Sequence, residues 1–158
     1  MPIPIAETAK ILLNSDRMLV TAESCTGGMI SSACTDLAGS SQWFERGFVT
    51  YSNEAKHEML GVPKELIDAH GAVSEPVARA MAMGAIEHSH ADVAVAVTGI
   101  AGPTGGSADK PVGMVWFGFA LNGECVTETK LFAGDRAAVR HATLRHALTR
   151  LNALLRLS

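Results

Sequence analysis

Ser24 and Lys56 are the two side chains whose types and positions could together support nucleophilic chemistry. Ser24 lies in ESCTGG (residues 23–28), where a short apolar run gives way to small and polar residues. A hydroxyl between a strand and a helix is held rigidly, and the free backbone N–H groups of residues 26–28 could hold an oxyanion or a phosphate. Serine is also a common helix N-cap, so this feature alone does not establish a nucleophile.

A serine nucleophile needs a base to take its proton. None of the six histidines sits in a recognisable Ser-His-Asp pattern. Lys56 is the other candidate, because burial or a neighbouring cation can lower the pKa of a lysine from about 10.4 toward about 7–8. It lies early in a helix predicted directly after a strand, and from there it could reach the strand ends. Taken alone, a solvated surface lysine is the simpler interpretation.

A glycine-rich segment, GIAGPTGGSADKPVG (residues 99–113), holds five of the fifteen glycines. Glycine lets the backbone approach a ligand closely and leaves its N–H donors unhindered. The order is neither GxGxxG nor GxxxxGK[ST], which excludes Rossmann and P-loop sites. Loops of this length in compact domains are more often functional, so we expect ligand contact here.

Arg136 and Arg140, one turn apart, could clamp an anion or could be solvated charges.

Seven of the eight aromatic residues fall within residues 43–51 and 116–119. Both stretches border the turns described above, so they could wall a pocket for a planar ring or could simply pack the sheet. No metal site is predicted, because the histidine pairs at positions 88 and 90 and at positions 141 and 146 lack companion carboxylates and the HExxH spacing.

Short elements alternate along the chain and must position these residues. Strands are predicted at residues 18–22, 46–51 and 92–99, followed by a hairpin of 114–121 and 125–132 around Asn122-Gly123. Helices are predicted over 5–15, from within 26–36, through Lys56 to Leu60 with Ser52 or Asn53 as cap, over 74–88, and from 134 onward. The expected fold is α/β, a three-layer α/β/α sandwich with a mixed, mostly parallel sheet and a C-terminal hairpin.

The composition limits the class of protein. The chain has 158 residues, 47% of them apolar and 5% aromatic, which suits one domain over residues 1–158 with a core of closely packed small side chains. A net charge of −3 gives no general attraction to nucleic acid. The sequence lacks a leader pattern, a membrane-spanning apolar stretch and a CxxC pair, so we expect a cytoplasmic protein with reduced cysteines.

Six motifs together resemble the CinA C-terminal domain family. They are AESCTGG (22–28), GSSQWFERGFVTYSNEAK (39–56), HGAVSEPVA (70–78), TGIAGPTGGS (98–107), KPVG (110–113) and FAGDR (132–136). The resemblance runs from about residue 5 to residue 150, and the stand-alone members of this family are nicotinamide-nucleotide amidases. It implies hydrolysis of the carboxamide of nicotinamide mononucleotide to nicotinate mononucleotide and ammonia, a salvage step of pyridine-nucleotide metabolism, without metal or organic cofactor.

The resemblance also implies roles for residues. Ser24 matches the family's nucleophile, Lys56 its base and Tyr51 its assisting tyrosine. The nucleotide is expected to contact the two glycine-rich turns and one arginine, and the resemblance does not decide between Arg136 and Arg140. The candidate binding residues are Cys25, Thr26, Gly27, Gly28, Thr98, Gly99, Gly102, Gly105, Gly106, Arg136 and Arg140. The pyridine ring would lie against the aromatic wall. A free-standing domain is expected from the length, and a homodimer from fold-level analogy.

Two alternatives remain open at this point. Cys25 could be the nucleophile, because thiolates at helix N-termini are activated. The chain could instead be a non-catalytic module that binds a nucleotide or a protein, since longer relatives are associated with competence and DNA-damage responses.

Overall fold

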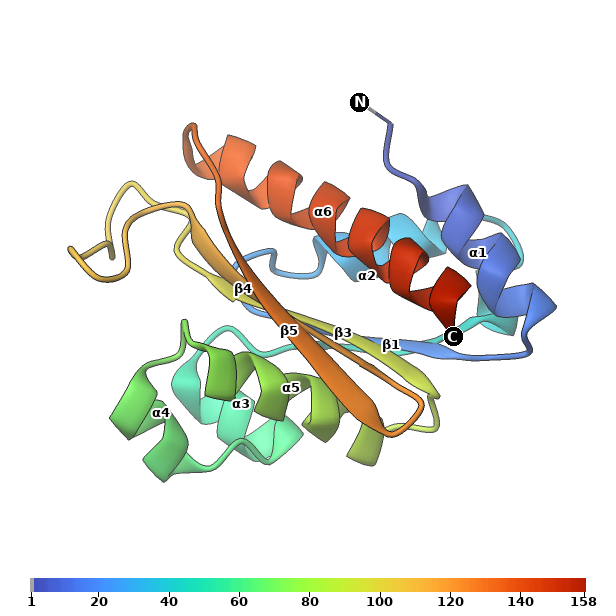
Figure 1. Cartoon of the computed structure of the whole chain (residues 1–158), viewed down its shortest axis with the longest axis horizontal. Helices are drawn as coiled ribbons and strands as arrows, with labels where there is room; N and C mark the ends of the chain where they lie inside the picture. Colours follow the sequence, from blue (N-terminus) through green and yellow to red (C-terminus); the bar gives the residue numbers. More distant parts are fainter. Residues whose placement is uncertain (1) are drawn as a thin grey trace.

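Five strands form one mixed sheet in the order β2-β1-β3-β4-β5 (Figure 1). Their bounds are β1 Leu19–Glu23, β2 Phe44–Val49, β3 Val93–Gly99, β4 Met114–Leu121 and β5 Glu124–Leu131. The computed structural model describes residues 2–158. Strand β1 pairs in parallel with β2 and β3, whereas β4 pairs antiparallel with both β3 and β5. Strand β4 alone therefore runs against the other four, and the β4–β5 hairpin confirms the predicted mixed sheet.

Helices cover both faces of the sheet (Figure 1). One layer contains α1 Ile5–Asn14, α2 Met29–Thr35 and α6 Arg136–Leu157, and the other contains α3 Asn53–Leu60, α4 Lys64–His70 and α5 Glu75–Glu87. Each layer has its own buried apolar cluster against the sheet, the first built around α6 and the second around α5. The α/β/α sandwich predicted from the sequence is confirmed.

The structure contains two elements beyond those predicted, and strand β2 lies two residues earlier than its predicted range. Helix α4 and the short 3-10 turn Ser40–Gln42 were not predicted. Ile67 is the only buried residue of α4, so its sequence carries little apolar periodicity. Strand β2 ends at Val49 rather than at residue 51, because the chain turns there into α3. Ser52 is the N-cap of α3, and its hydroxyl accepts the Ala55 N–H at 3.0 Å.

Small residues let the helices approach their neighbours closely, as the composition predicts. A Cβ added at Gly84 of α5 would overlap the backbone carbonyl of Leu60 at the end of α3. A Cβ added at Gly118 of β4 would lie 2.6 Å from the carbonyl oxygen of Ala78 in α5. Helix α5 is thereby seated on both β4 and α3, and α3 is the helix that carries Lys56.

Two further observations concern membrane spans and thiols. Across residues 2–158, no helix combines the length and the apolar character needed to cross a membrane. Cys25, Cys34 and Cys125 are all free thiols, as expected from their spacing.

Candidate active site

Ser24 lies directly after the carboxyl end of β1, the strand between β2 and β3. Its N–H donates to the carbonyl of Val97 in β3 at 3.1 Å, which fixes its backbone to the sheet. The chain then turns through Gly27 and Gly28, whose φ angles of 60° and 110° lie in the left-handed region that glycine tolerates. The predicted strand–turn–helix junction is confirmed, and it places the serine, which is 7% exposed, at the edge where parallel strands end.

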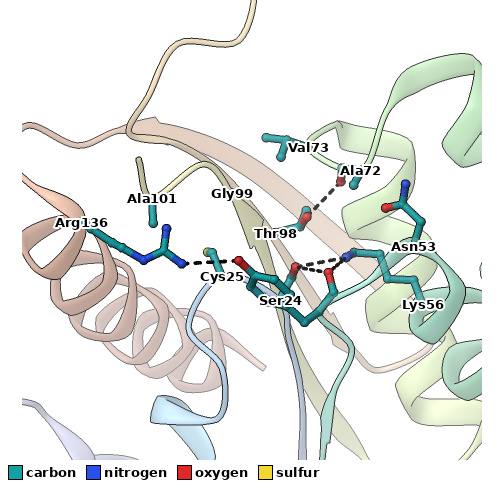
Figure 2. A pocket seen from close by; sticks show the side chains of 11 residues that line it. Ser24, Cys25, Asn53, Lys56, Ala72, Val73, Thr98, Gly99, Ala101 and Arg136 are labelled. Atoms are coloured by element: carbon teal, nitrogen blue, oxygen red, sulfur yellow. Dashed lines mark hydrogen bonds between the residues drawn. The ribbon is translucent and has the colours of Figure 1, made fainter. Parts of the chain in front are cut away.

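Lys56 reaches from α3 to this serine (Figure 2). Its Nζ lies 3.0 Å from Ser24 Oγ, 3.0 Å from the carbonyl oxygen of Thr50 and 3.1 Å from that of Tyr51. The side chain is only 1% exposed, so the interpretation of Lys56 as a surface lysine is wrong. Burial lowers the pKa of Lys56 to about 8, with the nearby Cys25 partly opposing the shift.

The three partners of Lys56 suit a neutral amine that acts as a base. A neutral amine has two N–H donors and one lone pair. Lys56 Nζ donates to both carbonyl oxygens and to Ser24 Oγ, and the Ser24 hydroxyl donates to the Tyr51 carbonyl at 3.4 Å. A neutral amine can keep its two N–H groups on the carbonyl oxygens and turn its lone pair toward the Ser24 hydroxyl. A buried amine of lowered pKa in contact with a hydroxyl is the geometry that a serine nucleophile with a lysine base would need.

Cys25 lies next to Ser24 but is held as a thiol. The side chain is 5% exposed. Burial is the main cause that raises the pKa of Cys25 to about 11, and the charge of Glu23 adds to the effect. Because the thiolate is the reactive form, the surroundings of Cys25 disfavour it as a nucleophile near neutral pH.

The turn after Ser24 presents free backbone donors. Within residues 2–158, the N–H groups of Cys25, Thr26 and Gly28 have no hydrogen-bond acceptor. The Gly27 N–H instead donates to the Ser24 carbonyl at 3.1 Å, so the prediction that Gly27 also supplies a free donor is wrong. Free N–H groups next to a serine hydroxyl are what an oxyanion hole requires, and of these three residues Cys25 lines the cavity in front of Ser24 whereas Thr26 and Gly28 do not.

A cavity of about 230 Å³ opens in front of Ser24 and Lys56. It is lined by Ser24, Cys25, Tyr51, Asn53, Lys56, Ala72, Val73, Thr98, Gly99, Ala101 and Arg136 (Figure 2). The Thr98 hydroxyl faces the cavity rim and donates to the Ala72 carbonyl at 3.0 Å. Asn53 was not singled out from the sequence, although it precedes Lys56 by three residues and so shares its helical face.

The expected aromatic wall is wrong except at Tyr51. Trp43 is buried at the opposite end of β1, where its carbonyl accepts the Leu19 N–H at 2.7 Å. Phe117 and Phe119 point into the core beneath α6 because residues two apart share one face of a strand. Tyr51, which is 62% exposed, is the single aromatic residue that lines the cavity.

The glycine-rich segment contributes to the cavity only through its first residues. Gly99 and Ala101 line it, whereas Gly102, Gly105 and Gly106 do not. Gly102 and Gly106 serve the fold of the loop, because added Cβ atoms there would lie 2.5 and 2.9 Å from the side chain of Val112. The expectation that these two glycines make room for a ligand is therefore wrong for this cavity.

The two arginines of α6 have different surroundings. Arg136 lines the cavity, donates to the Gly102 carbonyl at 2.8 Å and lies 3.4 Å from the Tyr51 hydroxyl. Arg140 lies behind the nucleophile turn, where its guanidinium donates to the carbonyl of Cys25 at 3.1 Å and that of Thr26 at 3.2 Å. Of the two residues, only Arg136 is open to a ligand in the cavity.

The family model for the CinA C-terminal domain matches residues 4–155. The chain belongs to the CinA C-terminal domain family. A curated relative from Escherichia coli strain K12, described as nicotinamide-nucleotide amidohydrolase PncC, is 59% identical over 131 residues, which cover 82% of this chain and 79% of the relative. A CinA-like protein from Geobacter sp. strain M21 is 54% identical over 147 residues, which cover 93% of this chain but 36% of that protein. CinA C-terminal domains thus also occur within longer chains.

Solved structures of CinA proteins share this fold. The competence damage-inducible protein A of Klebsiella pneumoniae is 39% identical, with a TM-score of 0.93 and coverage of 96% of this chain and 94% of that one. The competence/damage inducible protein CihA of Agrobacterium tumefaciens is 48% identical, with a TM-score of 0.90 and coverage of 98% and 97%. In the present CinA domain, residues 2–158 contain no group of three or more metal-ligating side chains.

Proposed function

We propose that this protein hydrolyses the carboxamide of nicotinamide mononucleotide, giving nicotinate mononucleotide and ammonia, with Ser24 as nucleophile and Lys56 as base. The observation that carries the proposal is the buried contact of 3.0 Å between Lys56 Nζ and Ser24 Oγ. The substrate is inferred from the E. coli relative, whose description specifies an amidohydrolase of nicotinamide nucleotides.

The first step forms an acyl-enzyme. Neutral Lys56 takes the hydroxyl proton of Ser24, and Oγ bonds to the amide carbon. The carbonyl oxygen becomes an oxyanion, which the free N–H groups of Cys25, Thr26 and Gly28 can stabilise. Protonated Lys56 then gives its proton to the amide nitrogen, the C–N bond breaks, and ammonia leaves a nicotinoyl ester on Ser24.

The second step releases the acid. Water attacks the ester carbon while Lys56 accepts one of its protons. The bond between Ser24 Oγ and the acyl carbon then breaks, Lys56 returns the proton to Oγ, and the acid leaves as the carboxylate after it loses its own proton to solvent. In this proposal Tyr51 assists through its backbone carbonyl, which holds Lys56, and through its ring at the cavity mouth. The Tyr51 hydroxyl accepts a hydrogen bond from Arg136, and within residues 2–158 it forms no hydrogen bond with Ser24 or Lys56. We therefore assign the proton transfer to the amide nitrogen to Lys56 and not to Tyr51.

Arg136 is the residue we assign to the phosphate of the nucleotide. A second cavity of about 480 Å³ adjoins the first and shares Ala101 and Arg136 with it. The nicotinamide would occupy the cavity at Ser24, and the ribose phosphate would extend past Arg136. A guanidinium matches the geometry of a phosphate because it donates two parallel hydrogen bonds.

The test is direct incubation with nicotinamide mononucleotide. We expect equimolar ammonia and nicotinate mononucleotide, measured by a coupled ammonia assay and by mass spectrometry. Ser24→Ala is the matched control and should bind the nucleotide without turnover. Binding without product by the folded wild type between pH 7 and 9 would refute the proposal and favour the non-catalytic binding module.

We also propose that the protein acts in the cytoplasm as a homodimer and without nucleic acid. The net charge of −3 and the three free thiols support the compartment and the lack of attraction to nucleic acid. Sedimentation equilibrium should give twice the chain mass of 16.6 kDa, and a single-chain mass at micromolar concentration would contradict the dimer.

A further inference from the structure

Glu23 is a buried carboxylate that the proposed mechanism does not use. It is the last residue of β1, it immediately precedes Ser24, and its exposed fraction is 0%. Within residues 2–158 it forms no salt bridge. A buried charge without an ion-pair partner is costly unless hydrogen bonds compensate it, so its partners indicate what it does.

Four donors satisfy the Glu23 carboxylate. Oε1 accepts the Thr26 hydroxyl at 2.6 Å and the Ile30 N–H at 2.9 Å. Oε2 accepts both the N–H and the hydroxyl of Ser31 at 3.0 Å. The carboxylate therefore joins the end of β1 to the first turn of α2, across the turn that carries Ser24 and the free donors.

The network extends to the neighbouring strand. The hydroxyls of Thr21 and Ser31 lie 2.6 Å apart, which orients the Ser31 hydroxyl beside Glu23. Gly47 of β2 leaves room for this pair, since a Cβ there would lie 2.7 Å from Thr21 Oγ1 and would overlap Ser31 Oγ. Strands β1 and β2 thus both fix the position of α2 relative to the carboxylate.

The opposite side of the same turn is held by Arg140. Its guanidinium binds the carbonyl oxygens of Cys25 and Thr26, at 3.1 and 3.2 Å. Arg140 thus orients the peptide groups that carry the N–H of Thr26 and of Gly27. Glu23 instead holds the Thr26 side chain and the first turn of α2, so the turn is fixed from two sides. The N–H groups of Cys25, Thr26 and Gly28 are the donors left free.

We propose that Glu23 is a positioning residue whose carboxylate orients the turn after Ser24, so that its free backbone N–H groups, those of Cys25, Thr26 and Gly28, face the oxyanion of the tetrahedral intermediate. The proposal rests on the amide hydrolysis proposed above. Glu23 touches neither the cavity nor Ser24 Oγ, so it acts only through the turn. Contacts to an oxyanion strengthen in the transition state, so their loss lowers kcat and leaves KM nearly unchanged.

Glu23→Gln is the first test. The glutamine keeps the shape but has one acceptor oxygen, so its NH₂ group must face the N–H of either Ile30 or Ser31, neither of which can accept. We expect kcat for nicotinamide mononucleotide to fall by about 10- to 100-fold, with KM changed less than about 2-fold. Ser31→Ala removes one hydroxyl donor and keeps the carboxylate, so kcat should fall less than in Glu23→Gln, again with KM nearly unchanged. If Glu23→Gln does not fold, Ser31→Ala serves as the test of the proposal.

The second readout is the thioamide analogue of nicotinamide mononucleotide. Sulfur accepts hydrogen bonds poorly, so the amide/thioamide ratio of turnover rates reports the N–H contacts. We expect Glu23→Gln to lower this ratio at least several-fold. Glu128→Gln is the matched control, because Glu128 is bound by His146 and Arg150 and does not line the cavity, and it should leave kcat and the ratio unchanged.

The outcomes separate the two proposals. If the wild type is active and the folded Glu23→Gln protein keeps both kcat and the rate ratio, Glu23 has only a structural role and the positioning proposal is overturned. An equal loss in Glu128→Gln would overturn it as well. If the wild type hydrolyses neither compound, the amidase function itself fails.

Discussion

Lys56 Nζ lies 3.0 Å from Ser24 Oγ, and both of its other polar partners are backbone carbonyls. In the part of the chain that the structure describes, no carboxylate forms an ion pair with Lys56. A carboxylate would stabilise the ammonium form, whereas burial beside neutral groups favours the free amine. The surroundings of Lys56 are therefore those of a base.

Replacing Lys56 with arginine tests the need for a neutral base. Arginine keeps a positive charge but stays protonated at any pH that the protein tolerates. We expect Lys56→Arg to lose at least about 10³-fold in kcat for nicotinamide mononucleotide between pH 7 and 10, as measured by ammonia release. Circular dichroism should confirm that the variant is folded, and substantial activity in it would contradict the role of Lys56.

The pH dependence of turnover should report the same amine. The lowered pKa of Lys56, about 8, means that the fraction of neutral amine rises with pH up to that value. We expect kcat/KM to rise about tenfold per pH unit below about 8 and to level off above it. A profile that is flat or falls between pH 6 and 8 would be incompatible with a lysine base.

Arg136 and Arg140 should give different kinetic defects. Removing a charged hydrogen bond costs about 1.5–3 kcal/mol, so Arg136→Gln should raise KM for nicotinamide mononucleotide by about 10- to 100-fold with little change in kcat. Nicotinamide riboside, which has no phosphate, should be hydrolysed equally by this variant and the wild type. Arg140→Gln should instead lower kcat, because Arg140 holds the carbonyls of the nucleophile turn. A raised KM in Arg140→Gln together with a lowered kcat in Arg136→Gln would contradict these assignments and indicate that Arg140 binds the phosphate.

Gly84 tests how the helices position the site. An alanine here would push its methyl group into the Leu60 carbonyl, where rigid backbone must move. We expect Gly84→Ala to lower the free energy of unfolding by about 2–4 kcal/mol in urea titrations. This loss exceeds the stabilisation that the higher helix propensity of alanine would provide. Gly123→Ala is a useful comparison, since a Cβ there would meet no atom within 4 Å and only its φ of 77° opposes the change. Equal stability of Gly84→Ala and the wild type would show that α5 can shift freely on α3.

The pairing of Ser24 with Lys56 could be predicted only through the resemblance to the CinA C-terminal domain family, and the choice of arginine could not be predicted at all. Ser24 directly follows one predicted strand and Lys56 lies early in the helix after the next, and parallel strands bring such ends together. Each residue taken alone nevertheless had a simpler structural interpretation. Arg136 and Arg140 are four residues apart on one helix, so they share a face and differ by about 6 Å along the axis. That rise places one in the cavity and the other behind the turn, and only the packing of α6 determines which.

The aromatic residues and Glu23 show a second limit. Clustering in sequence does not reveal which end of a strand or which face of the sheet a side chain occupies, and Trp43 and Phe117 lie in the core. Glu23 has no distinctive pattern, because its partners are two hydroxyls and two backbone N–H groups three to eight residues later. Such contacts depend on how the turn folds.

The most direct test compares the wild type with Ser24→Ala and Cys25→Ala in release of ammonia from nicotinamide mononucleotide. Ser24 should be essential, whereas the pKa of about 11 keeps Cys25 protonated and unreactive. We predict a loss of at least about 10³-fold for Ser24→Ala and less than about 10-fold for Cys25→Ala. Full turnover by Ser24→Ala together with its loss in Cys25→Ala would contradict the account.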